Sequence, residues 1–119
     1  MLGLAYPSRT RGLLSVPTTT NITRIRLIAA LWLRERGIGA IAVCGIQTNF
    51  CCETTARIGS DLGYDVWFVL DATHTFDIAA PDGEVVPAAE IARMTGINLQ
   101  GEFAEVVTTA AACTSKSAD

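Results

Sequence analysis

Apolar and polar residues follow two alternating patterns along the chain. Three segments place apolar residues at helical intervals, and between them lie short, wholly apolar runs that are typical of buried parallel strands. The expected helices cover residues 21–36, 50–62 and 87–99, and the expected strands cover residues 40–44, 66–70 and 103–108. This alternation, with its short connections, predicts an α/β fold with a parallel sheet and right-handed crossovers.

Local signals mark the ends of these elements. Asn21 and Asn49 can cap the first two helices, and a glycine follows each of them. Pro87 suits the first turn of the third helix. Residues 71–86 are rich in Thr, Asp, Pro and Gly and are expected to form a loop. A sheet of three strands leaves both of its edges exposed unless another segment covers them.

The two ends of the chain lack these patterns. Residues 1–20 show neither helical nor strand periodicity, contain two prolines and carry Arg but no acid. They are expected to form an irregular, poorly ordered leader, with an organelle transit peptide as the alternative. Residues 21–110 are then the folded domain, and residues 111–119, which are small and polar, are a tail expected to fray.

Composition narrows the class of protein. A chain of 119 residues, 50% of them hydrophobic, can form one domain with a buried core. Its net charge is −3, with +5 on residues 1–50 and −8 on residues 51–119. The pI near 5.0 and the scarcity of basic residues after Arg57 argue against a nucleic-acid partner. The lack of an unbroken apolar stretch of about 18 residues argues against a membrane span.

Cysteine usage speaks against a metal site and against a disulfide scaffold. The cysteines are Cys44, Cys51, Cys52 and Cys113, with no Cys-x-x-Cys spacing, and His74 is the single histidine. This set argues against a closed four-ligand zinc site, and no metal is expected. Few, unevenly spaced cysteines in a core-forming chain predict a reducing, cytoplasmic location.

Candidate chemistry gathers at the carboxyl ends of the first two expected strands, where ligands bind in open α/β sheets. Cys51 lies in the first turn of the expected helix that follows the strand at 40–44. The unpaired N–H groups of that turn stabilise a thiolate and could also hold an oxyanion, which favours nucleophilic attack on a carbonyl.

Three alternatives stay open at this point. The cysteines can all be inert core residues, as expected in any case for Cys44 and Cys52. Cys51 and Cys52 can instead serve a thiol redox protein. His74 is a candidate general base, or simply a loop histidine. Glu53 and Arg57, four residues apart on one helix, are expected to form a surface ion pair.

A longer motif sharpens this interpretation. Residues 45–57 read G-I-Q-T-N-F-C-C-E-T-T-A-R and are followed by G-Y-D-V at 63–66 and D-A at 71–72. Together with the lead-in at 33–38, these segments resemble the isochorismatase-like cysteine hydrolase family, whose pattern is G-x-x-T-[ND]-x-C-V-x-x-T-A-R. The resemblance runs from about residue 25 to residue 107. It departs at Cys52, where Val is usual.

The resemblance implies a fold and a reaction. The fold is a three-layer, Rossmann-like α/β/α sandwich around a parallel sheet. Cys51 matches the nucleophile, and the Ile46–Gln47 peptide matches a cis bond that shapes the oxyanion hole together with the Cys51 N–H. Members cleave amide or ureido C–N bonds of small molecules through an acyl-enzyme, without a cofactor. The remaining candidates for the pocket are Thr48, Asn49, Thr73 and His74.

The departures from the family are as informative as the match. The family's triad includes an Asp and a Lys that precede the nucleophile, whereas here neither residue type occurs before Cys51 and the only lysine is Lys116. We therefore expect the carboxyl-terminal half of such a hydrolase, truncated on its amino-terminal side and impaired in catalysis. A homo-oligomer or a complementing chain is the expected partner. The alternative function is an inactive fragment or assembly module that pairs with another subunit.

Overall fold

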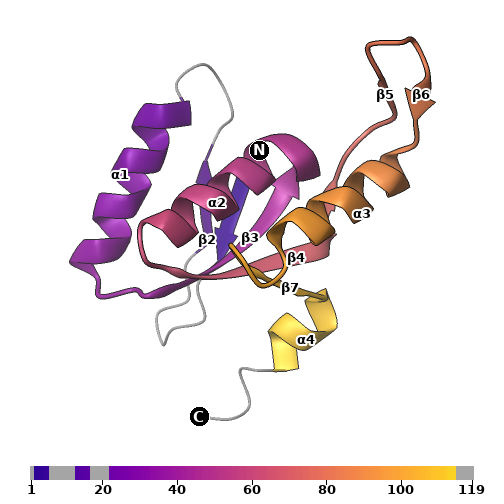
Figure 1. Cartoon of the computed structure of the whole chain (residues 1–119). Coiled ribbons are helices and arrows are strands. Elements are labelled where there is room, and N and C mark those ends of the chain that lie inside the picture. The colour runs from indigo at the N-terminus through magenta and orange to yellow at the C-terminus, as the bar shows by residue number, and fades with distance from the viewer. Residues whose placement is uncertain (1, 6–12, 17–21, 115–119) are drawn as a thin grey trace.

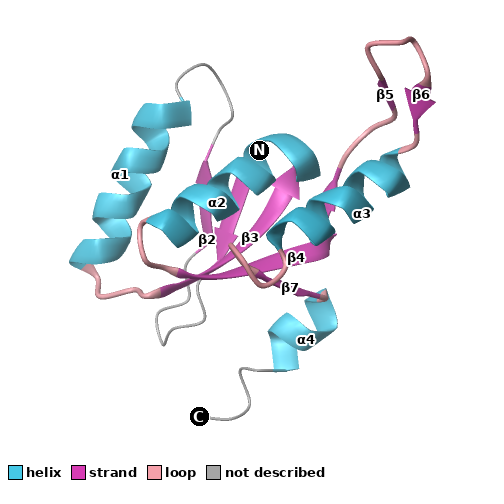
Figure 2. Ribbon diagram, viewed as in Figure 1, coloured by secondary structure: helices cyan, strands magenta, loops and turns pink. Residues whose placement is uncertain are grey.

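Helices and strands alternate along most of the chain. The computed structural model describes residues 2–5, 13–16 and 22–114, and Figures 1 and 2 show how its elements are arranged. Over this part of the chain the elements, in order, are β1 (Leu2–Ala5), β2 (Leu13–Val16), α1 (Ile22–Glu35), β3 (Ala40–Ile46), η1 (Thr48–Cys52), α2 (Glu53–Asp61), β4 (Asp65–His74), β5 (Ile78–Ala79), β6 (Val85–Val86), α3 (Ala88–Leu99), β7 (Glu105–Val107) and α4 (Thr109–Thr114).

The main sheet of the described residues has the strand order β2-β1-β3-β4-β7. The neighbours β3, β4 and β7 are parallel, which confirms the α/β class and the parallel arrangement of the three expected strands. The apolar runs at 40–44 and 66–70 form β3 and β4. Along β3 one face is buried, with Ile41 and Val43, while Ala40, Ala42 and Cys44 on the other face are partly exposed. β7 is shorter than the expected strand at 103–108.

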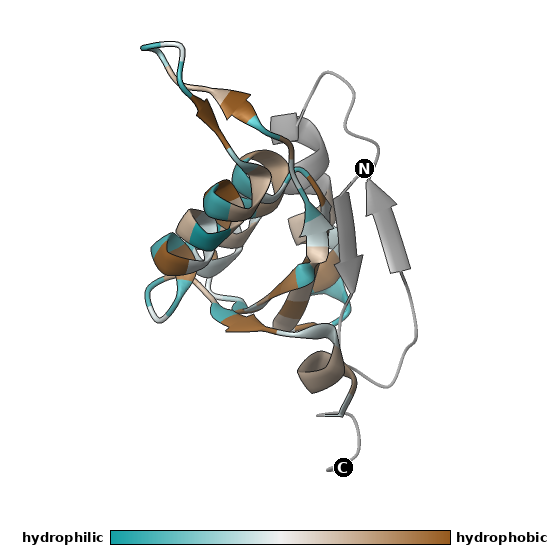
Figure 3. Ribbon diagram, turned by 90° about the vertical axis from the view of Figure 1, so that its right-hand side faces the viewer, coloured by the Kyte–Doolittle hydropathy of each residue, from teal (hydrophilic) through white to brown (hydrophobic). Residues whose placement is uncertain are grey.

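Helices α1, α2 and α3 share one face of the sheet. The core lies beneath them, where Val43 of β3 and Phe68 of β4, both with 0% exposure, pack in one cluster with buried residues of these helices, including Ala29, Ala56 and Leu99. Figure 3 shows α2 and α3 on one side of the sheet and α4 on the other. A second helical layer therefore exists in the described residues, but it is a single short helix.

The amino-terminal stretch departs from expectation. Residues 1–20 were expected to be irregular, yet β1 and β2 pair antiparallel with each other, and β1 pairs antiparallel with β3. The edge of β3 that was expected to be exposed is therefore hydrogen-bonded, and the sheet is mixed. Strands of four residues are too short for a periodic pattern to reveal them. Residues 1, 6–12 and 17–20 and the expected Asn21 cap lie outside the described residues.

Two further expectations are corrected. β4 continues to His74, and a two-stranded hairpin, β5–β6, lies inside the expected loop at 71–86. The hairpin turns at Pro81–Gly83, where Gly83 has φ +89°, a conformation that favours glycine.

Residues 111–114 were expected to fray but belong to α4. The first residue of this helix, Thr109, donates from its N–H to Asp71 Oδ1 over 2.7 Å. That carboxylate comes from the end of β4, so the local sequence did not reveal it. Residues 115–119 lie outside the described part.

Candidate active site

The turn between β3 and α2 carries the candidate nucleophile. The chain leaves β3 through a cis peptide bond between Ile46 and Gln47, the bond that the family resemblance implied. It then forms the short π-helical turn η1 before α2 begins. The Gln47 carbonyl accepts hydrogen bonds from the N–H groups of Phe50 and Cys52, over 3.2 and 3.1 Å. Cys51 is therefore held at the amino-terminal end of a continuous helical segment, on the carboxyl side of the sheet.

The adjacent cysteines have different surroundings. Cys51 is partly exposed, whereas Cys52 has 0% exposure and belongs to the core. Burial, and then the neighbouring thiols of Cys51 and Cys44, raise the pKa of Cys52 to about 12. Burial also raises the pKa of Cys44. Since the thiolate is the nucleophile, these shifts leave Cys44 and Cys52 unreactive, as expected from their positions. Cys113 is exposed on α4.

Hydroxyl groups join η1 to the end of β4. Thr48, which is 1% exposed, donates from Oγ1 to Thr73 Oγ1 over 2.8 Å. Thr73 in turn donates from the same oxygen to the carbonyl of Leu70 over 2.7 Å. Thr75, also buried, donates to Asn49 Oδ1 over 2.7 Å. Three of the expected pocket residues therefore lie together beside the candidate nucleophile, but their polar groups bond to protein.

His74 lies apart from this network. Its backbone is paired with Ile46 across the parallel sheet, and its side chain is exposed. The ring meets Phe76 edge to face, with a centroid distance of 4.9 Å. Within residues 22–114, no hydrogen bond joins the His74 ring to Cys51. The structure therefore gives no support to His74 as the base for this thiol, and its place in a substrate pocket stays a prediction.

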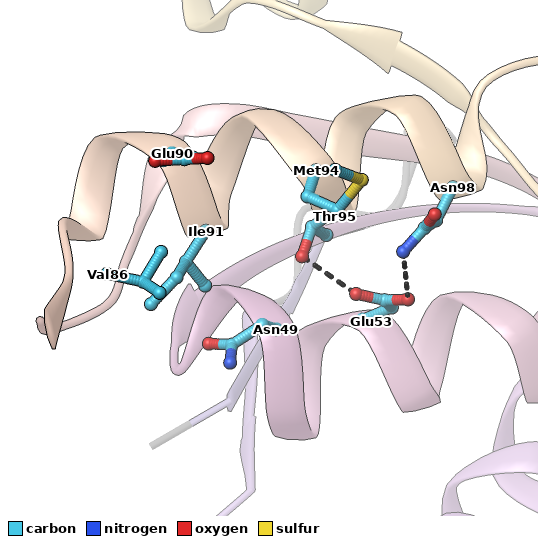
Figure 4. A pocket seen from close by; sticks show the side chains of 8 residues that line it. All are labelled: Asn49, Glu53, Val86, Glu90, Ile91, Met94, Thr95 and Asn98. Atoms are coloured by element: carbon cyan, nitrogen blue, oxygen red, sulfur yellow. Dashed lines mark hydrogen bonds between the residues drawn. The ribbon is translucent and has the colours of Figure 1, made fainter. Parts of the chain in front are cut away.

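A shallow groove of about 290 Å³ lies between α2 and α3. Figure 4 shows that it is walled by apolar side chains towards the β5–β6 hairpin and by polar side chains towards α2. The lining residues are Asn49, Glu53, Val86, Glu90, Ile91, Met94, Thr95 and Asn98. Asn49 and Glu53, which lie on either side of Cys51 in the sequence, are its nearest members, so the groove begins next to the η1 turn.

Glu53 joins the helices that form this groove. The expected pair with Arg57 is confirmed, at 3.0 Å between Arg57 Nη2 and Glu53 Oε1. In addition, Thr95, which is 1% exposed, donates to Glu53 Oε2 over 2.7 Å, and Asn98 donates to Oε1 over 3.5 Å. Sequence analysis missed this role because Thr95 is 42 residues away and carries no local signal.

We expect Glu53→Ala to lower the free energy of unfolding by about 1–3 kcal/mol, because it leaves the buried Thr95 hydroxyl without its acceptor. Glu53→Gln, which keeps an oxygen for Thr95, should cost less. Urea unfolding followed by circular dichroism measures both changes. The matched control is Glu90→Ala, an exposed acid of the same groove, with an expected change of less than about 0.5 kcal/mol. A Glu53→Ala protein as stable as the control would contradict the role of Glu53 in joining α2 to α3.

The described residues offer little for a metal or a membrane. In the part of the chain that the structure covers, no three His, Cys, Asp or Glu side chains are grouped so that they could hold a metal ion. Among the described helices, none combines the length and apolar character that a membrane crossing requires.

Comparison with known proteins agrees with this geometry. Residues 29–111 match the family described as Isochorismatase domain. The isochorismatase family protein YrdC of Bacillus subtilis (strain 168) is 29% identical over 94 residues, which are 79% of this chain and 50% of YrdC. A streptothricin hydrolase of Streptomyces noursei is 42% identical over 82 residues, which are 67% of this chain and 29% of the relative.

A solved structure extends the likeness to three dimensions. The cysteine hydrolase of Pseudomonas syringae pv. phaseolicola 1448A superimposes with a TM-score of 0.71 and 36% sequence identity, over 75% of this chain and 42% of that protein. This chain thus spans half or less of the length of each of these proteins.

Proposed function

Because the chain belongs to the isochorismatase family, we propose that it supplies the nucleophile of a cysteine hydrolase that cleaves an amide or ureido C–N bond of a small molecule. One observation carries the proposal: a partly exposed Cys51 lies in the first helical turn after the cis Ile46–Gln47 peptide, while the neighbouring thiol of Cys52 is buried and protonated. The name of the streptothricin hydrolase relative supports hydrolysis as the reaction class.

In the proposed reaction the Cys51 thiolate adds to the carbonyl carbon of the substrate. The N–H groups of Gln47 and Cys51 are the proposed donors to the oxyanion. The C–N bond then breaks, and its electron pair leaves with the amine, which takes up a proton. Water hydrolyses the resulting thioester, releasing a carboxylic acid and restoring the thiol.

The proposed reaction also needs groups that transfer protons, which the family's Asp and Lys would provide. The first aspartate is Asp61 and the only lysine is Lys116, so no Asp or Lys precedes Cys51. We propose that these groups are supplied from outside these 119 residues, for example by a complementing chain, and that turnover by these residues alone is slow. Loss of one member of a catalytic triad typically costs several powers of ten in rate.

The absence of an Asp or Lys before Cys51 also favours the second candidate function, a catalytically inactive module that pairs with another subunit. In that case Cys51 would keep its place in the fold but would not turn over an acyl group. The substrate's identity, a cytoplasmic location and the oligomeric state stay predictions for both functions.

Acyl transfer from p-nitrophenyl acetate distinguishes the two functions. We expect an acetyl group on Cys51, seen by peptide mass mapping, and its hydrolysis faster than that of an acetyl group on the exposed Cys113. Cys51→Ala should eliminate the rapid release of p-nitrophenol, whereas Cys113→Ala should preserve it. If an acetyl group on Cys51 is hydrolysed no faster than one on Cys113, the hydrolase proposal fails and the inactive module is favoured.

A further inference from the structure

Two successive hydroxyl hydrogen bonds attach the η1 turn, which carries Cys51, to the end of β4. Thr48 donates to Thr73 over 2.8 Å, and Thr73 donates to the Leu70 carbonyl over 2.7 Å. Because Thr73 uses its single hydroxyl proton on that carbonyl, its oxygen is left to accept from Thr48. Thr48 is 1% exposed, so water does not replace this acceptor.

A second hydrogen bond attaches the η1 turn to the residue that follows β4. Thr75, which is 5% exposed, donates to Asn49 Oδ1 over 2.7 Å. Thr73 is the next-to-last residue of β4, and Thr75 directly follows the strand. Two consecutive residues of η1, Thr48 and Asn49, are thus each tied to a threonine 25 or 26 residues further along the chain.

Other hydrogen bonds of the η1 turn join residues that are only a few positions apart in the sequence. The Gln47 carbonyl bonds to Phe50 and Cys52 within the same turn, and Thr54 donates to the Phe50 carbonyl over 2.7 Å within the same helical segment. Such bonds shape the turn but do not place it relative to the sheet. The threonine bonds do, since β4 is a central strand.

We propose that Thr73 and Thr75 are positioning residues, which fix the η1 turn against the end of β4 so that the Cys51 thiol and the amides around it keep a reactive geometry. This inference rests on the proposed function and deepens it. Small errors in the placement of a catalytic group are costly: a shift of about 1 Å can reduce a rate about 100-fold.

The test compares Thr73→Val, Thr73→Ser and the matched control Thr54→Val in the full chain. Valine has the shape of threonine but no hydroxyl, and serine restores the hydroxyl. The measurement is the pH profile of Cys51 alkylation by iodoacetamide, resolved by peptide mass mapping, with Cys113 as internal reference. We expect Thr73→Val to change the Cys51 profile by slowing alkylation at pH 7 about tenfold or more, because the displaced thiol loses its reactive geometry. Thr73→Ser and Thr54→Val should keep the original profile.

Cys52 separates positioning from loss of structure. If Thr73→Val only displaces the turn, buried Cys52 stays protected while the Cys51 profile changes. If Cys52 and Cys44 become reactive together with the change at Cys51, the hydroxyl is needed for the fold as a whole, and the positioning role is overturned. An unchanged Cys51 profile in Thr73→Val, or the same change in Thr54→Val, also overturns it.

Hydrolysis of an acetyl group on Cys51 tests the proposed function separately from the positioning inference. The proposed function fails if an acetyl group on Cys51 of the unaltered chain is hydrolysed no faster than one on Cys113. Where the unaltered chain does hydrolyse the acetyl group on Cys51 faster than that on Cys113, the positioning inference fails if Thr73→Val releases it equally fast; where it does not, the alkylation measurement alone decides the positioning inference. Acetylation of Cys51 followed by hydrolysis that is at least about tenfold slower in Thr73→Val, and restored in Thr73→Ser, supports both.

Discussion

Alkylation of the native chain at pH 8 is expected to modify Cys51 at least about a hundredfold faster than Cys52. Burial and two neighbouring thiols raise the pKa of Cys52 to about 12. At pH 8 a thiol with that pKa is ionised to only about one part in ten thousand, and its sulfur is also out of reach of the reagent. Cys51 is partly exposed, so its sulfur is within reach of the reagent.

The alkylation rate of Cys52 is expected to rise with pH. Below about pH 12 the thiolate fraction of Cys52 rises about tenfold for each pH unit, so its slow alkylation should accelerate with pH. Time-resolved peptide mass mapping measures both sites in one experiment. In urea the two cysteines should react at similar rates, because the selectivity belongs to the fold. Equal rates in the native chain would contradict the burial of Cys52.

Replacement of Phe68 by alanine should lower the free energy of unfolding by about 3–5 kcal/mol. Phe68 has 0% exposure, lies in the middle of β4 and packs in the same cluster as buried residues of α1, α2 and α3. Its removal takes away the apolar contacts of a whole ring and leaves a cavity under the helices. Since domains of this size are typically stable by about 5–15 kcal/mol, the loss is a large fraction of the total.

The matched control is Phe76→Ala. Phe76 is 50% exposed and contacts His74 edge to face, so its loss should cost less than about 1 kcal/mol. Urea unfolding at equal protein concentration compares the two variants. If Phe68→Ala is no less stable than Phe76→Ala, the core described around β4 does not carry the stability of the chain.

Elements with a strong local pattern could be predicted from the sequence. The apolar runs at 40–44 and 66–70 form β3 and β4, and the spacing before Gly63 predicted the helix that became η1 and α2. Weaker patterns failed. β1 and β2 have four residues each and the β5–β6 strands have two, so there is too little sequence for periodicity to appear.

The candidate site divides in the same way. The place of Cys51, in the first turn of the helical segment that follows β3, follows from local sequence, and so does the expectation that Cys52 is buried. The hydroxyl chain from Thr48 to Thr73 and the bond between Glu53 and Thr95 were not foreseen, because each joins residues 25 or 42 positions apart. No local pattern encodes such a contact, which depends on how strands and helices are placed side by side.

The sequence by itself thus determined the α/β class, the order of the central elements and the residue that bears the candidate nucleophile, because hydrophobic periodicity and turn chemistry act over a few residues. The tertiary structure decided which threonines hold the turn of Cys51 and which carboxylate joins α2 to α3. These properties arise only when the placement of β4 beside the η1 turn, and of α3 beside α2, brings distant side chains within hydrogen-bonding distance and excludes water from them.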